Sequence, residues 1–104
     1  MRARAEFDPV LRTGQRHGTR GLRVHYLQCA ASEARLGLVV PKRVAPRALD
    51  RNRVKRVARE SFRHWRGALP PLDVVLVAVS GAAGMSRAEL RQGCDQLFGR
   101  LARN

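Results

Sequence analysis

The chain has 104 residues and 44% hydrophobic residues, which favours one folded domain over residues 1–104 and excludes a disordered tail. Its net charge of +13 exceeds what solubility requires and predicts a polyanionic partner. No apolar run approaches the roughly 18 residues of a membrane span, and no signal peptide is recognisable, so we expect a cytoplasmic protein with no membrane role.

The first third of the chain predicts one helix and one strand. Residues 5–13 form the helix, with Pro9 acceptable only in its first turn and Asp8 as its N-cap, unless the helix begins a few residues earlier. Residues 15–21 are rich in turn formers, and residues 22–29 alternate as a half-buried strand does. The apolar stripe of the helix consists of Phe7, Val10 and Leu11.

The middle of the chain predicts a strand, a basic loop and a basic helix. Residues 35–41 form the strand, and residues 42–49 form the loop. The helix follows over residues 50–66, with Asp50 as its N-cap, and ends before Gly67. One face of the strand carries Leu36, Leu38 and Val40.

The last third predicts a buried strand and an amphipathic helix. Residues 72–79 are almost continuously apolar, as in a central strand covered on both faces. Ser86 and Glu89 form a capping box that opens the last helix. The stripe of that helix is Leu90, Cys94, Leu97, Phe98 and Leu101. Cys94 and the distant Cys29 fit no metal or redox motif, so we expect two reduced thiols.

The order of these elements predicts an α+β fold, a small sandwich with helices packed on one sheet. The strand–helix–strand unit over residues 35–79 is expected to bring two parallel strands together. The positive charge is uneven along the chain. Residues 1–66 hold 17 of the 21 cations and five of the eight acids, so the binding surface is expected in the first two thirds.

The basic helix carries seven cations and two acids over residues 50–66. At about 100° per residue, one side of this helix is apolar and the opposite side is cationic. Like charges three or four residues apart cost roughly 0.2–0.5 kcal/mol each, which argues against a face that meets only water. A phosphate backbone would turn this repulsion into attraction. The apolar side is Val54, Val57, Ala58, Phe62 and Trp65; the cationic row is Asn52, Arg56, Arg59, Arg63 and Arg66, flanked by Lys55.

The aromatic residues indicate what kind of nucleic-acid contact to expect. Three of the five lie on predicted core stripes, which leaves Phe7 and Tyr26 as the only candidates for stacking on bases. Contact should therefore be mostly to phosphates and riboses, with a strong dependence on salt.

Several runs of this sequence resemble the protein subunit of bacterial ribonuclease P. They are RLGLVVPKRV, RNRVKRVARESFR and DVVLVAV, and the RNRVKR run matches the RNR motif of that family. EFDPVLRTG and ELRQGCDQLFGRLAR also fit, so the resemblance covers nearly the whole chain. It implies an α-β-β-β-α-β-α sandwich with a four-stranded mixed sheet and an unusual left-handed strand–helix–strand crossover.

The resemblance also implies a function. The chain would be a subunit of the endoribonuclease that removes the 5′ leader of precursor tRNA. Its partners would be the catalytic RNA subunit, with one protein per RNA, and the precursor tRNA. Hydrolysis of the phosphodiester would depend on Mg²⁺ ions held mainly by the RNA, so the protein would bind no metal and supply no catalytic residue.

By motif match, the basic helix and the loop before it would contact RNA. The expected RNA-binding residues are Arg51, Asn52, Arg53, Lys55, Arg56, Arg59, Arg63, Lys42 and Arg43. The first helix and one face of the sheet would line the leader-binding cleft, with Phe7, Leu11 and Tyr26 in it. The strand register decides whether Tyr26 or His25 points into this cleft. Leu11 stands where the family usually has a second aromatic residue, which predicts weaker or displaced stacking.

The sequence also bears on three other kinds of function. A self-contained ribonuclease needs positioned acid and base groups, and His17, His25 and His64 lie in different predicted elements without a supporting motif. A structural RNA-binding protein of ribosomal type is the main alternative, and composition alone does not exclude it. A DNA-binding helix module lacks the expected pair of turn and recognition helix.

Overall fold

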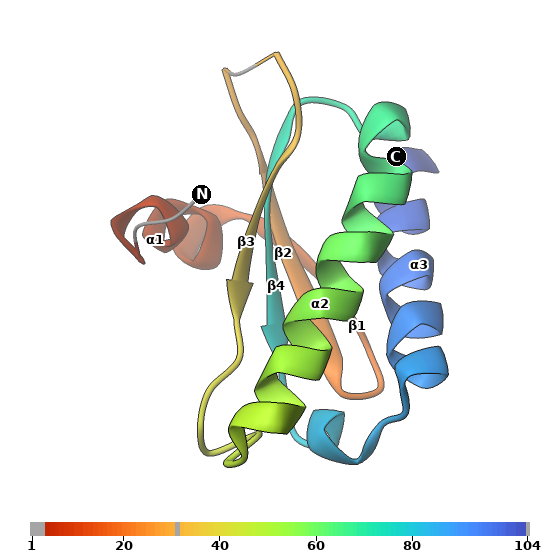
Figure 1. Cartoon of the computed structure of the whole chain (residues 1–104). Coiled ribbons are helices and arrows are strands. Elements are labelled where there is room, and N and C mark those ends of the chain that lie inside the picture. The colour runs from red at the N-terminus through yellow and green to blue at the C-terminus, as the bar shows by residue number, and fades with distance from the viewer. Residues whose placement is uncertain (1–3, 31, 104) are drawn as a thin grey trace.

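The computed structural model describes residues 4–30 and 32–103, and within them the order of elements matches the predicted α+β sandwich (Figure 1). The elements are α1 (Arg4–Thr13), β1 (Gln15–Thr19), β2 (Leu22–Gln28), β3 (Arg35–Val39), α2 (Ala48–Trp65), η1 (Arg66–Ala68), β4 (Leu72–Ala78), η2 (Ala82–Gly84) and α3 (Arg87–Arg103). No helix among these residues is both long and apolar enough to span a bilayer.

The four strands form one mixed sheet in the order β1-β2-β4-β3. β1 pairs with β2 and β2 with β4 in antiparallel fashion, whereas β3 and β4 are parallel, with Arg35 opposite Asp73. Seen from the α2 side with both parallel strands running downward, β4 lies to the right of β3 (Figure 1). The β3–α2–β4 crossover is therefore left-handed, against the general rule.

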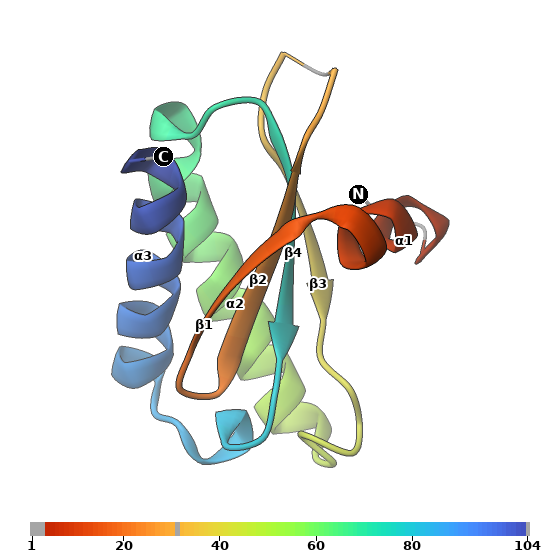
Figure 2. The same cartoon turned by 180° about the vertical axis from the view of Figure 1, so that it is seen from behind.

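The helices lie on both faces of the sheet. α2 and α3 cover one face, and α1 crosses the other (Figure 1, Figure 2). The sequence of β4 is apolar throughout because its alternate residues point to opposite faces of the sheet, and helices cover both faces. Val74 and Leu76 belong to the core beneath α2 and α3, whereas Val75 joins Phe7 and Val10 in a smaller cluster beneath α1.

The last helix follows its sequence pattern closely. The Ser86 and Glu89 capping box is present, with the Glu89 carboxylate accepting from the Ser86 N–H at 2.9 Å and the Glu89 N–H donating to Ser86 Oγ at 3.1 Å. The predicted stripe of α3 is fully buried against α2 and the sheet: Leu90, Cys94, Leu97, Phe98 and Leu101.

An additional contact holds α2 and α3 together. The Asp95 carboxylate on α3 accepts hydrogen bonds from Ser61 Oγ at 2.6 Å and Trp65 Nε1 at 3.1 Å, both on α2. Arg91 donates to the same carboxylate from the preceding turn of α3. Burial alone would raise the pKa of Asp95, but the hydrogen bonds from Ser61, Arg91 and Trp65 outweigh it and lower that pKa. This carboxylate therefore links α3 to the last turns of α2, in addition to the apolar packing between the two helices.

The segment predicted as turn-rich, residues 15–21, contains strand β1. Only its end is a turn, where Gly21 adopts a φ of 74°, in the left-handed region that favours glycine. β1 is an edge strand with the polar sequence QRHGT, so it lacks the apolar alternation that identified β2.

Two expectations about helix starts were wrong. α2 begins at Ala48 with Arg47 as its N-cap, so Asp50 lies inside the first turn and caps nothing. Asp50 is instead buried and forms an ion pair with Arg53. Pro9 is the sixth residue of α1 rather than part of its first turn, and it is tolerated on the exposed side of that helix.

Candidate RNA interface

The outer side of α2 carries the predicted cationic row. Arg56, Arg59 and Arg63 are exposed, and none of them forms an ion pair with any residue that the structure describes. Asn52 is exposed in the same row, and Lys55 is half-buried beside it. The opposite side packs into the core through Val54, Val57, Ala58 and Phe62. This helix therefore presents unneutralised guanidinium groups on a rigid support, as a phosphate-binding surface requires.

The two arginines of the RNR motif have a different environment from the rest of the row. Arg51 Nη1 donates to the carbonyl oxygens of Ala45 at 3.0 Å and Pro46 at 2.8 Å. Arg53 Nη1 donates to the Met85 carbonyl oxygen at 3.1 Å, and its Nη2 pairs with Asp50. Both side chains thus hold the start of α2 against neighbouring segments, while Asn52 between them faces solvent.

Lys42 and Arg43 lie in the loop between β3 and α2, and both are exposed. The loop is shaped by the Pro41 carbonyl, which accepts from the N–H groups of Val44 and Ala45 at 3.0 Å each. The loop lies at the same end of the molecule as the start of α2 (Figure 1), and Arg43 lines a hollow there together with Arg23 and the end of β4.

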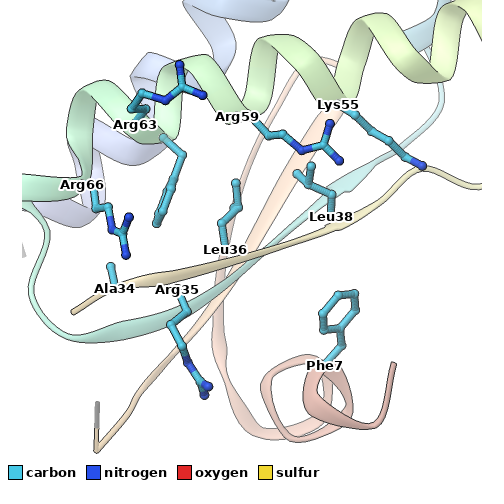
Figure 3. A pocket seen from close by; sticks show the side chains of 10 residues that line it. Phe7, Ala34, Arg35, Leu36, Leu38, Lys55, Arg59, Arg63 and Arg66 are labelled. Atoms are coloured by element: carbon cyan, nitrogen blue, oxygen red, sulfur yellow. The ribbon is translucent and has the colours of Figure 1, made fainter. Parts of the chain in front are cut away.

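An open groove of about 660 Å³ runs between α2 and the edge strand β3. Figure 3 shows cationic side chains of α2 on one side of β3 and Phe7 on the other. Arg59, Arg63 and Lys55 line the groove, while Arg66 is engaged with Glu33 at 2.6 Å. The floor is apolar, formed by Ala34, Leu36, Leu38 and Phe62. A cationic wall over an apolar floor suits a nucleic-acid strand better than a small anion.

The face of the sheet beneath α1 contains the residues predicted for a leader cleft, with one exception. Phe7 packs so closely on β3 that a Cβ atom at Gly37 would lie 2.5 Å from its ring. Leu11 is half-buried at the same face. Tyr26 does not belong to it, because Tyr26 is opposite Val74 and packs in the core beneath α2 and α3.

His25 occupies the place that Tyr26 was expected to fill. It is opposite Val75, which packs beneath α1, so the register turns His25 toward the sheet face beneath α1. Arg23 and Arg16 flank it on the same face. Burial, together with the charges of Arg23 and Arg16, lowers the pKa of His25 below the ordinary value of a histidine.

Tyr26 has other partners at the far side of the sheet. Its hydroxyl donates to Gln15 Oε1 at 2.9 Å and lies 3.0 Å from His17 Nε2. Because His17 and His25 are on opposite faces of the sheet and His64 is exposed on α2, the three histidines do not meet. Nor do three His, Cys, Asp or Glu side chains gather anywhere in the described residues in a way that could hold a metal ion.

Three cations on or beside the candidate surfaces were not named from the sequence. Arg16 lies in a segment predicted as a turn, and Arg23 was not assigned to a face before the register was known. Arg87 comes from the nearly neutral last third of the chain, and the fold brings it beside Asn52 and Arg56. The only sequence signal for Arg87 was its place directly after the Ser86 cap.

These features agree with comparisons to known proteins. A family model described as ribonuclease P matches residues 1–102. The chain belongs to the ribonuclease P protein family. A ribonuclease P protein component from Azoarcus sp. is 44% identical over 96 residues, which cover 92% of this chain and 80% of that relative. One from Cronobacter sakazakii is 38% identical over 99 residues, covering 95% and 83% of the two chains.

Solved ribonuclease P proteins have the same fold. The protein from Thermotoga maritima, in complex with 1-(4-fluorophenyl)-2-thiourea, matches with a TM-score of 0.84 at 25% identity, over 100% of this chain and 98% of that one. The protein from Staphylococcus aureus matches with a TM-score of 0.88 at 22% identity, over 96% and 92%, and shows likeness of fold. Membership in the ribonuclease P family makes this chain an RNA-binding protein of tRNA processing.

Proposed function

We propose that this chain is the protein subunit of a ribonuclease P holoenzyme and that it docks on the catalytic RNA through α2 and the loop before it. The observation that carries the proposal is the row of exposed guanidinium groups at Arg56, Arg59 and Arg63, none of which forms an ion pair within residues 4–30 and 32–103. Lys42 and Arg43 extend the same surface. In the family, such a surface would meet the phosphates of a folded RNA rather than a base sequence.

The second part of the proposal concerns precursor tRNA. The 5′ leader would lie on the sheet face beneath α1, where Leu11 and His25 offer contacts to bases and Arg16 and Arg23 offer contacts to phosphates. Phe7 is only 8% exposed, so it supports the cleft wall more than it offers a free ring for stacking. This agrees with the absence of a second aromatic residue at Leu11 and predicts a leader contact that relies less on stacking.

Within the residues that the structure describes, no three His, Cys, Asp or Glu side chains gather in a way that could hold a metal ion. Asp73 pairs with Arg35, Asp95 with Arg91 and Asp50 with Arg53, so these three carboxylates face guanidinium groups. In the proposed holoenzyme, Mg²⁺ held mainly by the RNA would supply the chemistry, and the protein would position the leader and reduce repulsion between the two RNAs.

Cleavage of a precursor tRNA by a bacterial ribonuclease P RNA at low Mg²⁺, with and without this protein, tests the proposal. We expect strong stimulation with one protein bound per RNA, declining steeply as salt increases because phosphate contacts are screened. Binding to other structured RNA without stimulation would overturn the proposal and support the ribosomal-type alternative, which no feature of the structure favours by itself.

A further inference from the structure

A small hollow at the start of α2 combines groups that a phosphate contact alone does not require. It has a volume of about 310 Å³ and is lined by Leu49, Asn52, Arg53, Arg56 and Arg87. Leu49 is 65% exposed, and it is the only large hydrophobic side chain so exposed in the part of the chain that the structure describes. A single exposed leucine is ordinary on a protein surface. Its position inside a cationic hollow, beside an exposed amide, is what needs an explanation.

The hollow is preformed by contacts beneath it. Arg53 spans from α2 to the segment before α3 by donating to the Met85 carbonyl oxygen, and its other nitrogen pairs with Asp50. The beginnings of α2 and α3 are thereby fixed at the same end of the molecule (Figure 1). Arg87, the first residue of α3, completes the lining. A ligand would therefore find the lining already in place, which lowers the entropy cost of binding.

The charges of the hollow select an anionic partner. Arg56 and Arg87 form no ion pair with the described residues, and the lining contains no carboxylate. Asp50, the nearest acid on α2, is buried and paired with Arg53. A bilayer surface would require a broad apolar face, whereas this site has one leucine.

The uncharged side chains of the hollow indicate which kind of anionic ligand fits it. An amide such as that of Asn52 offers a donor and an acceptor, which match the edge of a nucleobase. Guanidinium planes stack on unpaired bases, and an aliphatic side chain covers part of a base's apolar face. We infer that this hollow, formed by Leu49, Asn52, Arg56 and Arg87, binds one unstacked nucleobase of the RNA on which α2 docks. The inference rests on the proposed function and adds a base contact to a surface otherwise suited to phosphates.

Binding of the full-length protein to a bacterial ribonuclease P RNA, measured over a series of salt concentrations, tests the inference. Leu49→Ala should weaken binding about tenfold with an unchanged salt slope, because it removes apolar contact and no charge. Leu49→Met, which keeps the apolar volume, should restore binding. Asn52→Ala should weaken binding by a similar factor. Gln92→Ala removes an exposed amide of α3 outside the hollow and serves as the matched control, with affinity unchanged.

A second readout distinguishes a base from a phosphate. Reagents that modify the pairing edges of unpaired bases should find one base that is protected by the native protein and reactive with Asn52→Ala. Arg87→Ala should reduce the slope of log K against log salt by about 0.7–0.9 if Arg87 meets a phosphate flanking that base.

The outcomes separate this inference from the proposed function. If the native protein binds the RNA and Leu49→Ala binds equally well, the base site is refuted, whereas the proposal that α2 docks on the RNA is unaffected. If only Arg87→Ala weakens binding, the hollow is a phosphate contact, which also refutes the base site. If the native protein fails to bind any ribonuclease P RNA, the proposed function fails, and the base site fails with it.

Discussion

Arginines only a few residues apart on α2 have different environments: some hold the helix against neighbouring segments, and others extend into solvent. Arg53 is tied to the Met85 carbonyl and to buried Asp50, whereas Arg56 points outward without an ion-pair partner among the described residues. A motif match treats the two alike, since it records residue type and not direction.

Removing Arg53 should therefore affect the fold more than removing Arg56. We expect Arg53→Ala to lower the free energy of unfolding by about 1–3 kcal/mol, because it leaves the Asp50 carboxylate buried without a partner. Arg56→Ala should change it by less than about 0.5 kcal/mol. Urea denaturation of both variants checks this. Equal stability of the two would mean that the contacts of Arg53 contribute nothing to folding.

His25 provides a pH-dependent test of the leader face. Its pKa is lowered by burial first and then by Arg23 and Arg16, so the unfolded chain binds this proton more readily than the folded one. The stability that this difference provides is present above the unfolded pKa near 6.5 and is lost as pH falls below it.

Titration of the His25 ring by NMR should show a pKa below the ordinary value in the free protein. It should rise when a single-stranded leader is added, because phosphates would offset the charges of Arg23 and Arg16. A pKa that leader RNA leaves unchanged would argue that the leader does not pass over this face.

At the scale of elements, α1 packs on the sheet through a small apolar cluster in which Phe7 lies directly over Gly37. A Cβ at Gly37 would come within 2.5 Å of the Phe7 ring, so a larger residue there must shift that ring. We expect Gly37→Ala to destabilise the protein by about 1–3 kcal/mol through overpacking.

The matched control for this contact is Phe7→Leu, alone and combined with Gly37→Ala. The smaller side chain makes room for the added methyl group, so the double variant should lose less stability than the two single variants predict by addition. Simple additivity in thermal or urea unfolding would contradict the contact as described.

How far the elements could be predicted depended on how much of each was buried. β4 and α3 were predicted nearly in full, since their apolar patterns reflect packing that the fold requires. β1 is an edge strand of polar residues and has no such pattern, so only the family resemblance implied a third strand before α2. The start of α2 was misplaced because Asp50 is a common N-cap type, and only tertiary packing shows that it pairs with Arg53 instead.

At the scale of the whole molecule, exposed positive charge gathers on the outer face of α2 and at the end of the molecule where α2 begins. We expect Arg56→Ala combined with Arg59→Ala to weaken assembly with the catalytic RNA and to reduce the salt slope by about 0.7–0.9 for each phosphate that the variant no longer binds. Circular dichroism and thermal unfolding should show an intact fold, since both side chains are exposed.

If that double variant unfolds instead, the cationic row of α2 is needed for folding, and the docking proposal is refuted. Gln92→Ala, an exposed change on α3, controls for general effects of surface substitution.

The candidate site was predictable in part at this scale. The helical period separates the exposed row of α2 from its core side, and the structure agrees. Which strand residue faces α1 depends on register, so Tyr26 was named where His25 lies. Arg87 joins the start of α2 only through the tertiary fold, and no local pattern could have placed it there.

The parallel pairing of β3 with β4 has a consequence for how the protein persists in a cell. α2 lies in the chain between these two strands, so its outer face exists in a fixed orientation only once residues 38 positions apart, such as Arg35 and Asp73, have paired. RNA that binds this face binds the folded chain alone, and at a hundredfold excess over its dissociation constant it adds about 2.7 kcal/mol to stability. Chains made in excess of the RNA lack this protection and are the first available to proteases. We therefore expect the level of the protein to follow the level of its RNA.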